Sequence, residues 1–215
     1  KKFNITGACF PAQHYMADTS RKFDRILAMV EAGDYFIINR PRQYGKTTLL
    51  FQLSEALNQS EGWMAFNLSF EGIGDAAFQE ETAFSQSFLR QMARFAELLS
   101  PGLSAWIKEA ALRAQSLEDV SIWISDLVRK TNKKVVLLID EVDKSSNNQL
   151  FISFLGVLRN KYLDRNFFPT FHAVVLARRS DFLQAVAALR SKKIAKYGGK
   201  WNFLGQIASR LSSYK

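Results

Sequence analysis

A glycine, a lysine and two threonines, Gly45-Lys46-Thr47-Thr48, stand where a short apolar run gives way to a helix-forming stretch. The first N–H groups of a helix have no partner within the helix and carry partial positive charge, so they bind phosphate oxygens. Gly45 lets the backbone approach closely. The Lys46 ammonium suits β- and γ-phosphates, and the Thr47 hydroxyl can ligate Mg²⁺. This pattern predicts a phosphate-binding loop.

The match to a phosphate loop has one departure. Such a loop has a glycine five residues before Gly45, and this chain has Arg40 there. Taken alone, the segment is also compatible with an ordinary strand–turn–helix that contains Gly-Lys-Thr by chance. If it is a phosphate loop, the residues that contact the nucleotide are Arg42, Gln43, Tyr44, Gly45, Lys46, Thr47 and Thr48.

A second candidate group, Asp140-Glu141, follows the apolar run at 135–139. In phosphoryl transfer the first acid after such a strand holds Mg²⁺ and the second polarises the attacking water. Alternatively, the two acids only end a strand at the surface. Ligands bind at the carboxyl ends of the strands in open parallel sheets. Two motifs in this order, each at such an end, favour nucleotide binding.

The elements that must position these residues follow from the apolar periodicity. Strands alternate with helices along the chain, so we predict an α/β fold with a parallel sheet covered on both faces. Thr19 or Ser20 can cap the first helix. We expect strands at 35–39, 63–69, 135–139 and 171–177, helices at 19–31, 46–57 and 150–159, and helix-rich stretches at 76–99 and 103–130, divided by Ser100-Pro101-Gly102.

The fourth predicted strand ends beside two arginines and a serine. Arg178, Arg179 and Ser180 are placed for sensing a γ-phosphate, and the alternative is that they are surface residues, since arginines are mostly exposed. His172 falls at the start of the same strand. We expect it to pack against its neighbours or lie at an edge, not to act as a catalyst.

With these residues identified, the chain resembles the predicted AAA-type ATPases, a bacterial and archaeal family of P-loop ATPases near the STAND group. The family's loop also replaces the first glycine by arginine. The resemblance covers about residues 3–177. It rests on Asn39-Arg40-Pro41-Arg42-Gln43-Tyr44-Gly45-Lys46-Thr47-Thr48, His14-Tyr15-Met16-Ala17-Asp18, Leu68-Ser69-Phe70-Glu71-Gly72 and Leu138-Ile139-Asp140-Glu141-Val142-Asp143.

The resemblance implies a three-layer α/β/α P-loop NTPase with a mostly parallel sheet, in which the acidic strand lies beside the second strand. It implies ATP and Mg²⁺ as cofactors, with Lys46 and Glu141 catalytic and with Thr47 and Asp140 as metal ligands. Tyr15 is the candidate for packing on the adenine base, and plain core packing is its alternative. The expected output is a conformational change in an attached domain or a second subunit.

The segment 178–215 departs from the family pattern. It contains nine Lys and Arg against a single acid, Asp181, and so carries net charge +8 of the chain's +9. We expect the fifth strand to be absent or irregular and no helical lid to follow. The segment is either a basic surface for nucleic acid or a partner, or a divergent or truncated end. We therefore expect an ATPase core at 1–177 and a basic segment at 178–215.

Composition limits the remaining functional classes. The 215 residues are 47% hydrophobic, enough for one domain with a sizeable core. The sequence contains no apolar run long enough to span a bilayer, so no membrane partner is expected. A single cysteine, Cys9, cannot form an internal disulfide, which favours a cytoplasmic setting. The expected function is an ATPase; the alternatives are a nucleotide-binding scaffold that hydrolyses poorly and a nucleic-acid-associated protein that uses the basic tail.

Overall fold

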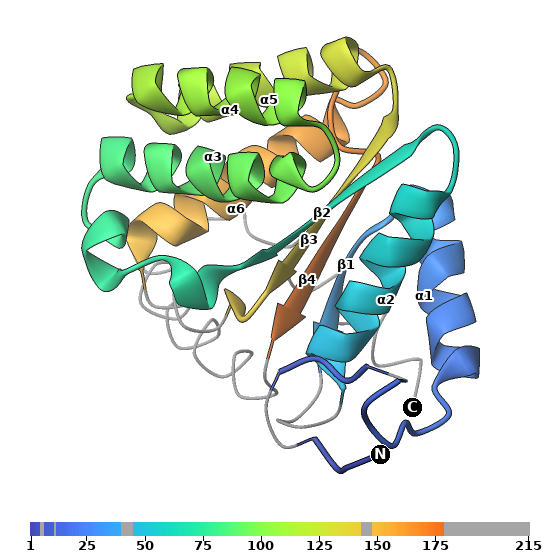
Figure 1. Ribbon diagram of the computed structural model, residues 1–215. Coiled ribbons are helices and arrows are strands. Elements are labelled where there is room, and N and C mark those ends of the chain that lie inside the picture. The colour runs from blue at the N-terminus through green and yellow to red at the C-terminus, as the bar shows by residue number, and fades with distance from the viewer. Residues whose placement is uncertain (5–6, 11, 40–44, 143–147, 179–215) are drawn as a thin grey trace, which may run out of the picture.

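A sheet of four parallel strands runs through the middle of the molecule (Figure 1). The computed structural model describes residues 1–4, 7–10, 12–39, 45–142 and 148–178. The strands are β1 (Tyr35–Asn39), β2 (Trp63–Ser69), β3 (Lys134–Asp140) and β4 (Ala173–Arg178), and their order in the sheet is β1-β4-β3-β2. The acidic strand β3 pairs with β2 and not with β1, which confirms the expected topology.

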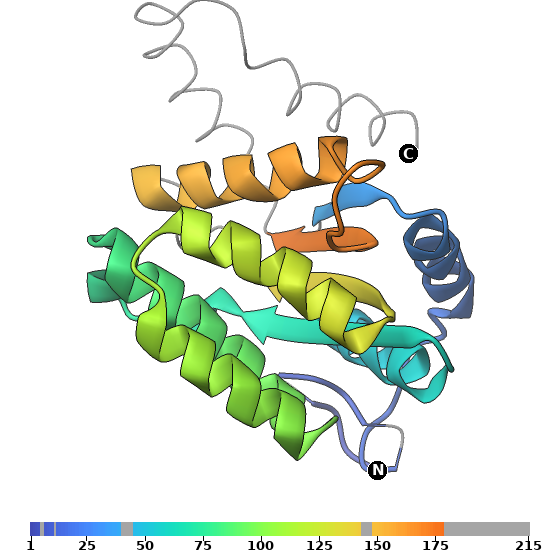
Figure 2. The ribbon, with the colours of Figure 1, turned by 90° about the horizontal axis from the view of Figure 1, so that it is seen from above.

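Helices cover both faces of this sheet, as Figure 2 shows. Among the described residues, two helices lie on one face and four on the other, which gives the predicted three-layer α/β/α arrangement. Two short 3-10 turns, Phe70–Gly72 and Asp75–Phe78, connect β2 to the first helix of the larger layer. The helices are α1 (Ser20–Glu31) and α2 (Lys46–Gln59) on the first face, and α3 (Glu81–Glu97), α4 (Pro101–Arg113), α5 (Leu117–Thr131) and α6 (Gln149–Leu163) on the second.

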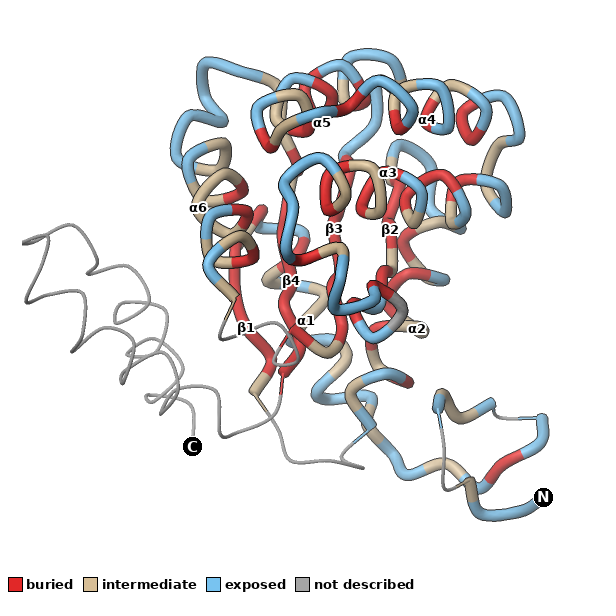
Figure 3. The backbone as a smooth tube through the Cα atoms, turned by 90° about the vertical axis from the view of Figure 1, so that its left-hand side faces the viewer, coloured by how far each residue is buried: buried red, intermediate tan, exposed pale blue. Residues whose placement is uncertain are grey.

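Alternate residues of each strand enter the two layers. In β1, Phe36 and Ile38 pack with α1 and α2, whereas Tyr35 and Ile37 pack with the core beneath α3 to α6. Successive side chains of a strand point to opposite faces, so a sheet covered on both faces needs continuous apolar runs. Figure 3 shows the result, with buried residues concentrated in the strands and on the inner sides of the helices.

The larger layer is built around a cluster of phenylalanine side chains. Phe70 is fully buried and its ring centroid lies 5.6 Å from that of Phe151 and 6.0 Å from that of Phe154. Phe84 meets Phe154 edge-on at 5.1 Å. These rings join the turn after β2 to α3 and α6, so the chain leaving the carboxyl end of β2 is fixed by aromatic packing.

The predicted strands agree closely with the structure, and the differences lie at helix ends. Pro101 and Gly102 do not divide two helices but form the first turn of α4, where proline is tolerated because its missing N–H would have no helical partner. The helix-rich stretch expected at 103–130 contains α4, which ends at Arg113, and α5, which Ser116 caps through a reciprocal pair of bonds with Asp119. Thr19 stands at the start of α1 without a side-chain capping bond.

Two further observations concern the limits of the described chain. Within the residues that the structure describes, none of the helices combines the length and the apolar character needed to cross a membrane. The basic segment beyond Arg178, together with the expectations placed on it, lies outside the described residues.

Candidate functional site

The carboxyl ends of the four strands meet at one edge of the sheet, the lower edge in Figure 1. Across the sheet their last residues are Asn39, Arg178, Asp140 and Ser69. Asn39 lies opposite Arg178 and Ser69 lies opposite Asp140 in the strand register. The helix α2 also begins at this edge, so the two sequence motifs predicted to act together are on the same side of the molecule.

The start of α2 has the backbone geometry that the glycine was expected to allow. Gly45 precedes the helix with φ of 74°, a left-handed conformation that residues with a side chain rarely adopt. Among the described residues, none has an atom within 4 Å of the place where a Cβ of Gly45 would stand. In the described part of the chain no capping hydrogen bond from a side chain is present at this helix, and its first turn contains no acid. The amide groups at its beginning are therefore suited to an anion.

A hydrogen bond joins the two motifs directly. The Thr47 hydroxyl donates to Oδ2 of Asp140 at 2.6 Å, although the two residues are 93 positions apart in the chain. Asp140 is only 5% exposed, while Thr47 is exposed. A hydroxyl and a carboxylate side by side are the kind of oxygen ligands that Mg²⁺ takes. The two side chains predicted to hold the metal ion are therefore in direct contact.

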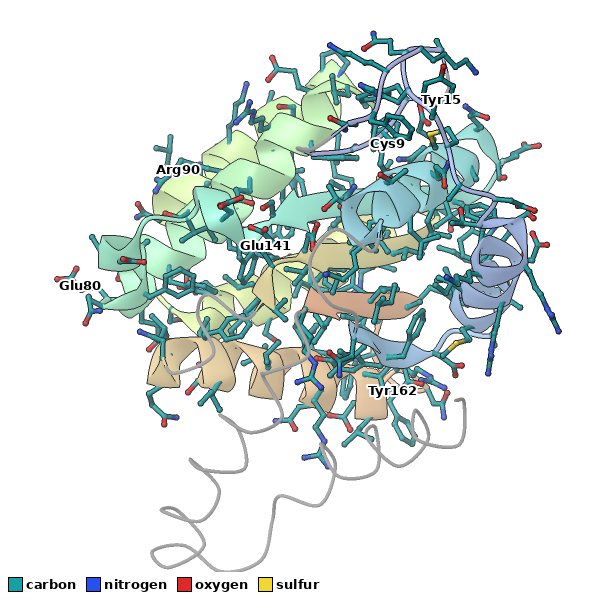
Figure 4. The ribbon with its side chains drawn as sticks, turned by 90° about the horizontal axis from the view of Figure 1, so that it is seen from below. Cys9, Tyr15, Glu80, Arg90, Glu141 and Tyr162 are labelled. Carbon is teal, nitrogen blue, oxygen red and sulfur yellow. The ribbon has the colours of Figure 1, made fainter. Side chains whose placement is uncertain are left out.

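Glu141 lies just beyond the strand and adopts an unusual backbone conformation. The strand β3 ends at Asp140, and Glu141 has φ of 58°. A left-handed conformation at a residue other than glycine costs roughly 1 kcal/mol or more and is found preferentially at functional sites. Because Glu141 lies beyond the end of β3, this turn, and not the alternation of side chains along the strand, separates the two acids. Figure 4 shows Glu141 near the middle of the sheet edge.

The N-terminal segment is attached to the first turns of α2. The backbone N–H of Cys9 donates to the Thr48 hydroxyl at 2.9 Å, and the ring of Phe10 meets Phe51 edge-on at 5.3 Å. The buried His14 accepts a hydrogen bond from the Phe10 N–H through Nδ1. No periodicity in this segment predicts the contact, and the motif around His14 is its one signal in the sequence.

Tyr15 lies on the surface of this N-terminal segment. Its side chain is 57% exposed and its ring packs against that of Phe3 at a tilt of 36° and a centroid distance of 5.0 Å. The alternative that Tyr15 is a core residue is therefore wrong. In Figure 4, Tyr15 and Cys9 lie on the same part of the edge, well apart from Glu141.

Arg178 is not a surface residue after the strand, as the alternative interpretation had it, but the last residue of β4. It is 2% exposed, because it stands between β1 and β3 in the sheet. His172 directly precedes β4, where its Nε2 is 3.1 Å from the carbonyl oxygen of Glu31 and its ring meets Trp63 edge-on. His172 is thus a packing residue, as expected.

Several predicted site residues fall where the structure makes no statement. The expectations placed on them therefore stay predictions from the sequence. Eight of these residues lie outside the described residues: Arg40, Pro41, Arg42, Gln43 and Tyr44 of the loop, the acid Asp143, and the sensor candidates Arg179 and Ser180.

A protein-family model matches most of the chain. The family model described as a predicted AAA-ATPase matches residues 21–197, a range that includes both motifs, all four strands and part of the basic segment. None of the curated proteins matches the chain.

Proposed function

Because the chain belongs to the predicted AAA-ATPase family, we propose that it binds ATP with Mg²⁺ at the start of α2 and hydrolyses it. The observation that carries this proposal is the 2.6 Å hydrogen bond between Thr47 and Asp140. It joins Thr47 of the proposed phosphate loop to Asp140 of the acidic motif. If either segment resembled its motif only by chance, the two residues would not need to be in contact.

The residues at this edge fit a bound nucleotide with its metal ion. The beginning of α2 offers backbone N–H groups to phosphate oxygens, and Lys46 adds a positive charge next to them. Thr47 and Asp140 are the residues that would hold Mg²⁺. When bound, Mg²⁺ neutralises charge on the phosphate oxygens. The positive charge of Lys46 would neutralise the same phosphate oxygens, and this is its proposed catalytic role.

Glu141 is the proposed group for activating water. Its carboxylate can accept a proton from a water molecule or orient that water toward the terminal phosphate. The left-handed turn places Glu141 off the strand that carries Asp140. Glu141 can therefore serve the nucleophile while Asp140 stays with Thr47.

Tyr15 is the proposed contact for the adenine base. Its ring is exposed and rests on Phe3, which leaves an aromatic surface on the segment that Cys9 attaches to α2. Aromatic faces stack well on purine rings. The remaining proposed contacts, Arg42, Gln43, Tyr44, Gly45 and Thr48, follow from the loop sequence.

The output of the ATPase cycle is proposed from the sequence alone. We propose that hydrolysis changes the conformation of an attached domain or a second subunit. A scaffold that binds ATP but hydrolyses it slowly is the alternative, since an arginine donated by a partner can accelerate hydrolysis by roughly three to five orders of magnitude. A third proposal is that the basic segment binds nucleic acid. The proposed location of the protein is the cytoplasm.

The test compares the Lys46→Ala variant with the wild-type chain. Binding of ATP is measured by calorimetry with and without Mg²⁺, and hydrolysis is measured by phosphate release. We expect Lys46→Ala to weaken binding by about 10- to 100-fold, because hydrogen bonds to a charged group contribute roughly 1.5–3 kcal/mol. Lys22→Ala on the exposed side of α1 is the matched control and should bind as the wild type does.

The outcomes separate the three proposals. Wild-type affinity in Lys46→Ala would contradict the phosphate-loop assignment. Binding without measurable phosphate release would favour the scaffold. A DNA titration at increasing salt, without nucleotide, tests the basic segment, because electrostatic binding must weaken steeply with salt.

A further inference from the structure

A cavity lies between α5 and α6, away from the proposed nucleotide site. These helices run side by side in the larger layer (Figures 1 and 3). The cavity has a volume of about 440 Å³ and is closed on one side by Phe168 and Thr170, which precede β4. It therefore borders the end of the sheet where the strands begin, opposite the edge that carries Asp140. Its volume is within the range of small-molecule pockets.

A lysine on the wall of this cavity is held in place by hydrogen bonds. The Lys161 Nζ donates to the Ser125 hydroxyl at 2.8 Å, and that hydroxyl in turn donates to the carbonyl oxygen of Pro169 at 2.8 Å. Ser125 is buried and Lys161 is half-buried. An ammonium group has three N–H donors, and the bond to Ser125 uses one. The chain of bonds fixes the position of a positive charge at the cavity.

The charges on the cavity wall favour an anion. The lining includes two cations, Lys161 and Arg129, and one acid, Asp164. Arg129 also pairs with Asp126 at 2.9 Å, but both side chains are about half exposed and such pairs are weak. Burial lowers the pKa of Lys161, and the Arg129 charge lowers it further, while Asp126 and Asp164 raise it. A bound anion would offset both the free-energy cost of burying this charge and its repulsion by Arg129.

Apolar side chains line the rest of the cavity. Ile122 and Phe168 are 57% and 61% exposed, and Val157 also lines the cavity. Exposed apolar side chains beside fixed polar groups are the usual composition of small-molecule sites. We propose that this cavity binds a small organic anion, with Lys161 and Arg129 holding the anionic group and Ile122 and Phe168 contacting an apolar body.

Pyridoxal 5′-phosphate is a suitable probe, because it has an anionic group, an aromatic ring and an aldehyde. The Lys161 amine attacks the aldehyde carbon, a C=N bond forms, and water leaves; borohydride then reduces the imine to a stable amine. The full chain is labelled near neutral pH, reduced and digested, and the modified lysines are identified by mass spectrometry. We expect Lys161 to be labelled several-fold faster than Lys130, an exposed lysine on α5.

A comparison with pyridoxal, which lacks the phosphate, separates anion binding from amine reactivity. Arg129→Gln removes a charge that lowers the pKa of Lys161, so labelling by either reagent slows. If Arg129 also holds the anion, labelling by pyridoxal 5′-phosphate must fall by a larger factor than labelling by pyridoxal. Arg90→Gln on the exposed side of α3 is the control and should change neither rate.

Two results would overturn the inference. One is labelling of Lys161 no faster than that of Lys130. The other is an equal effect of Arg129→Gln on both reagents, which would show a reactive amine without an anion site. Both results are independent of ATP binding, which is measured at the other edge of the sheet.

Discussion

The backbone N–H of Glu141 donates a hydrogen bond of 2.8 Å to Oδ1 of Asp140, the residue that precedes it. The other carboxylate oxygen of Asp140 accepts from Thr47. The carboxylate of Asp140 is thus fixed from both sides, whereas that of Glu141 is carried on a turn beyond the strand. Two adjacent acids with different surroundings are suited to different tasks.

Substitution of each acid by its amide should separate these tasks. Glu141→Gln keeps the backbone bond to Asp140 and should leave ATP affinity within about twofold, while hydrolysis falls by roughly 100-fold or more, as is usual when a general base is removed. Asp140→Asn should weaken the Mg²⁺-dependent part of ATP binding. Calorimetry with and without Mg²⁺, together with phosphate release, measures both effects. If the two variants lose binding and turnover to the same extent, the division of roles is wrong.

The attachment of Cys9 to Thr48 can be followed by alkylation, because Cys9 is the single cysteine of the chain. Thr48→Val keeps the side-chain shape but removes the acceptor of the Cys9 N–H. We expect a maleimide to modify this variant faster than the wild type, and Mg-ATP to slow modification of the wild type. Thr82→Val, which removes a hydroxyl bonded to the Gln115 carbonyl on another part of the protein, is the control. Unchanged rates in Thr48→Val would show that this contact does not hold the segment.

Much of this edge of the sheet could be predicted because its residues follow apolar runs directly. A strand buried on both faces is recognisable as a continuous run, and the residue after it must lie at the sheet edge, which is how Asp140 was placed. The left-handed turn at Glu141 has no such signature. The burial of Arg178 was also missed, because arginine at a strand end is usually exposed and only the sheet order puts it between β1 and β3.

Contacts between distant segments were beyond the reach of the sequence. The bonds from Cys9 to Thr48 and from Lys161 to Ser125 join residues that share no local pattern. Helix boundaries failed for a different reason. Proline and glycine at 101 and 102 suggest a break, yet both are compatible with a first helical turn once Ser100 caps it, and the helix begins there.

The phenylalanine cluster should dominate the stability of the larger layer. Phe70→Ala removes a fully buried ring with aromatic neighbours on α3 and α6. We expect the free energy of unfolding to fall by about 3–5 kcal/mol, the usual cost of a large cavity in a core. Urea unfolding followed by circular dichroism measures this. Phe167→Ala, at a residue that is 81% exposed, is the matched control, and an equally small effect of both changes would contradict the packing described here.

The buried phenol of Tyr35 predicts a loss of stability at high pH. Burial raises the pKa of Tyr35 above its ordinary 10.0, and the charge of Arg159 offsets only part of this. Above about pH 10 the unfolded chain therefore gives up the phenol proton while the folded chain keeps it, so stability falls as pH rises. At about pH 11 the contribution is roughly 1.4 kcal/mol relative to neutral pH.

Tyr35→Phe removes this titration. Urea unfolding of both proteins at about pH 9 and about pH 11 gives the comparison, since any other cost of the substitution is common to both conditions. We expect the variant to lose less stability than the wild type between the two. Equal losses would mean that the phenol titrates normally in the folded protein.

The order of the strands also governs when the molecule can fold during synthesis. Tyr35 pairs with Val174, and within the described part of the chain β4 is the strand neighbour of β1. The last of the described strands, β4, therefore fills the gap between β1 and the β2–β3 pair. A nascent chain stalled before residue 173 has α2 and the acidic strand β3 but no bridge between β1 and the other described strands. Such long-range parallel pairing is slow, so the ribosome must release almost the whole domain before its first strand is protected from aggregation.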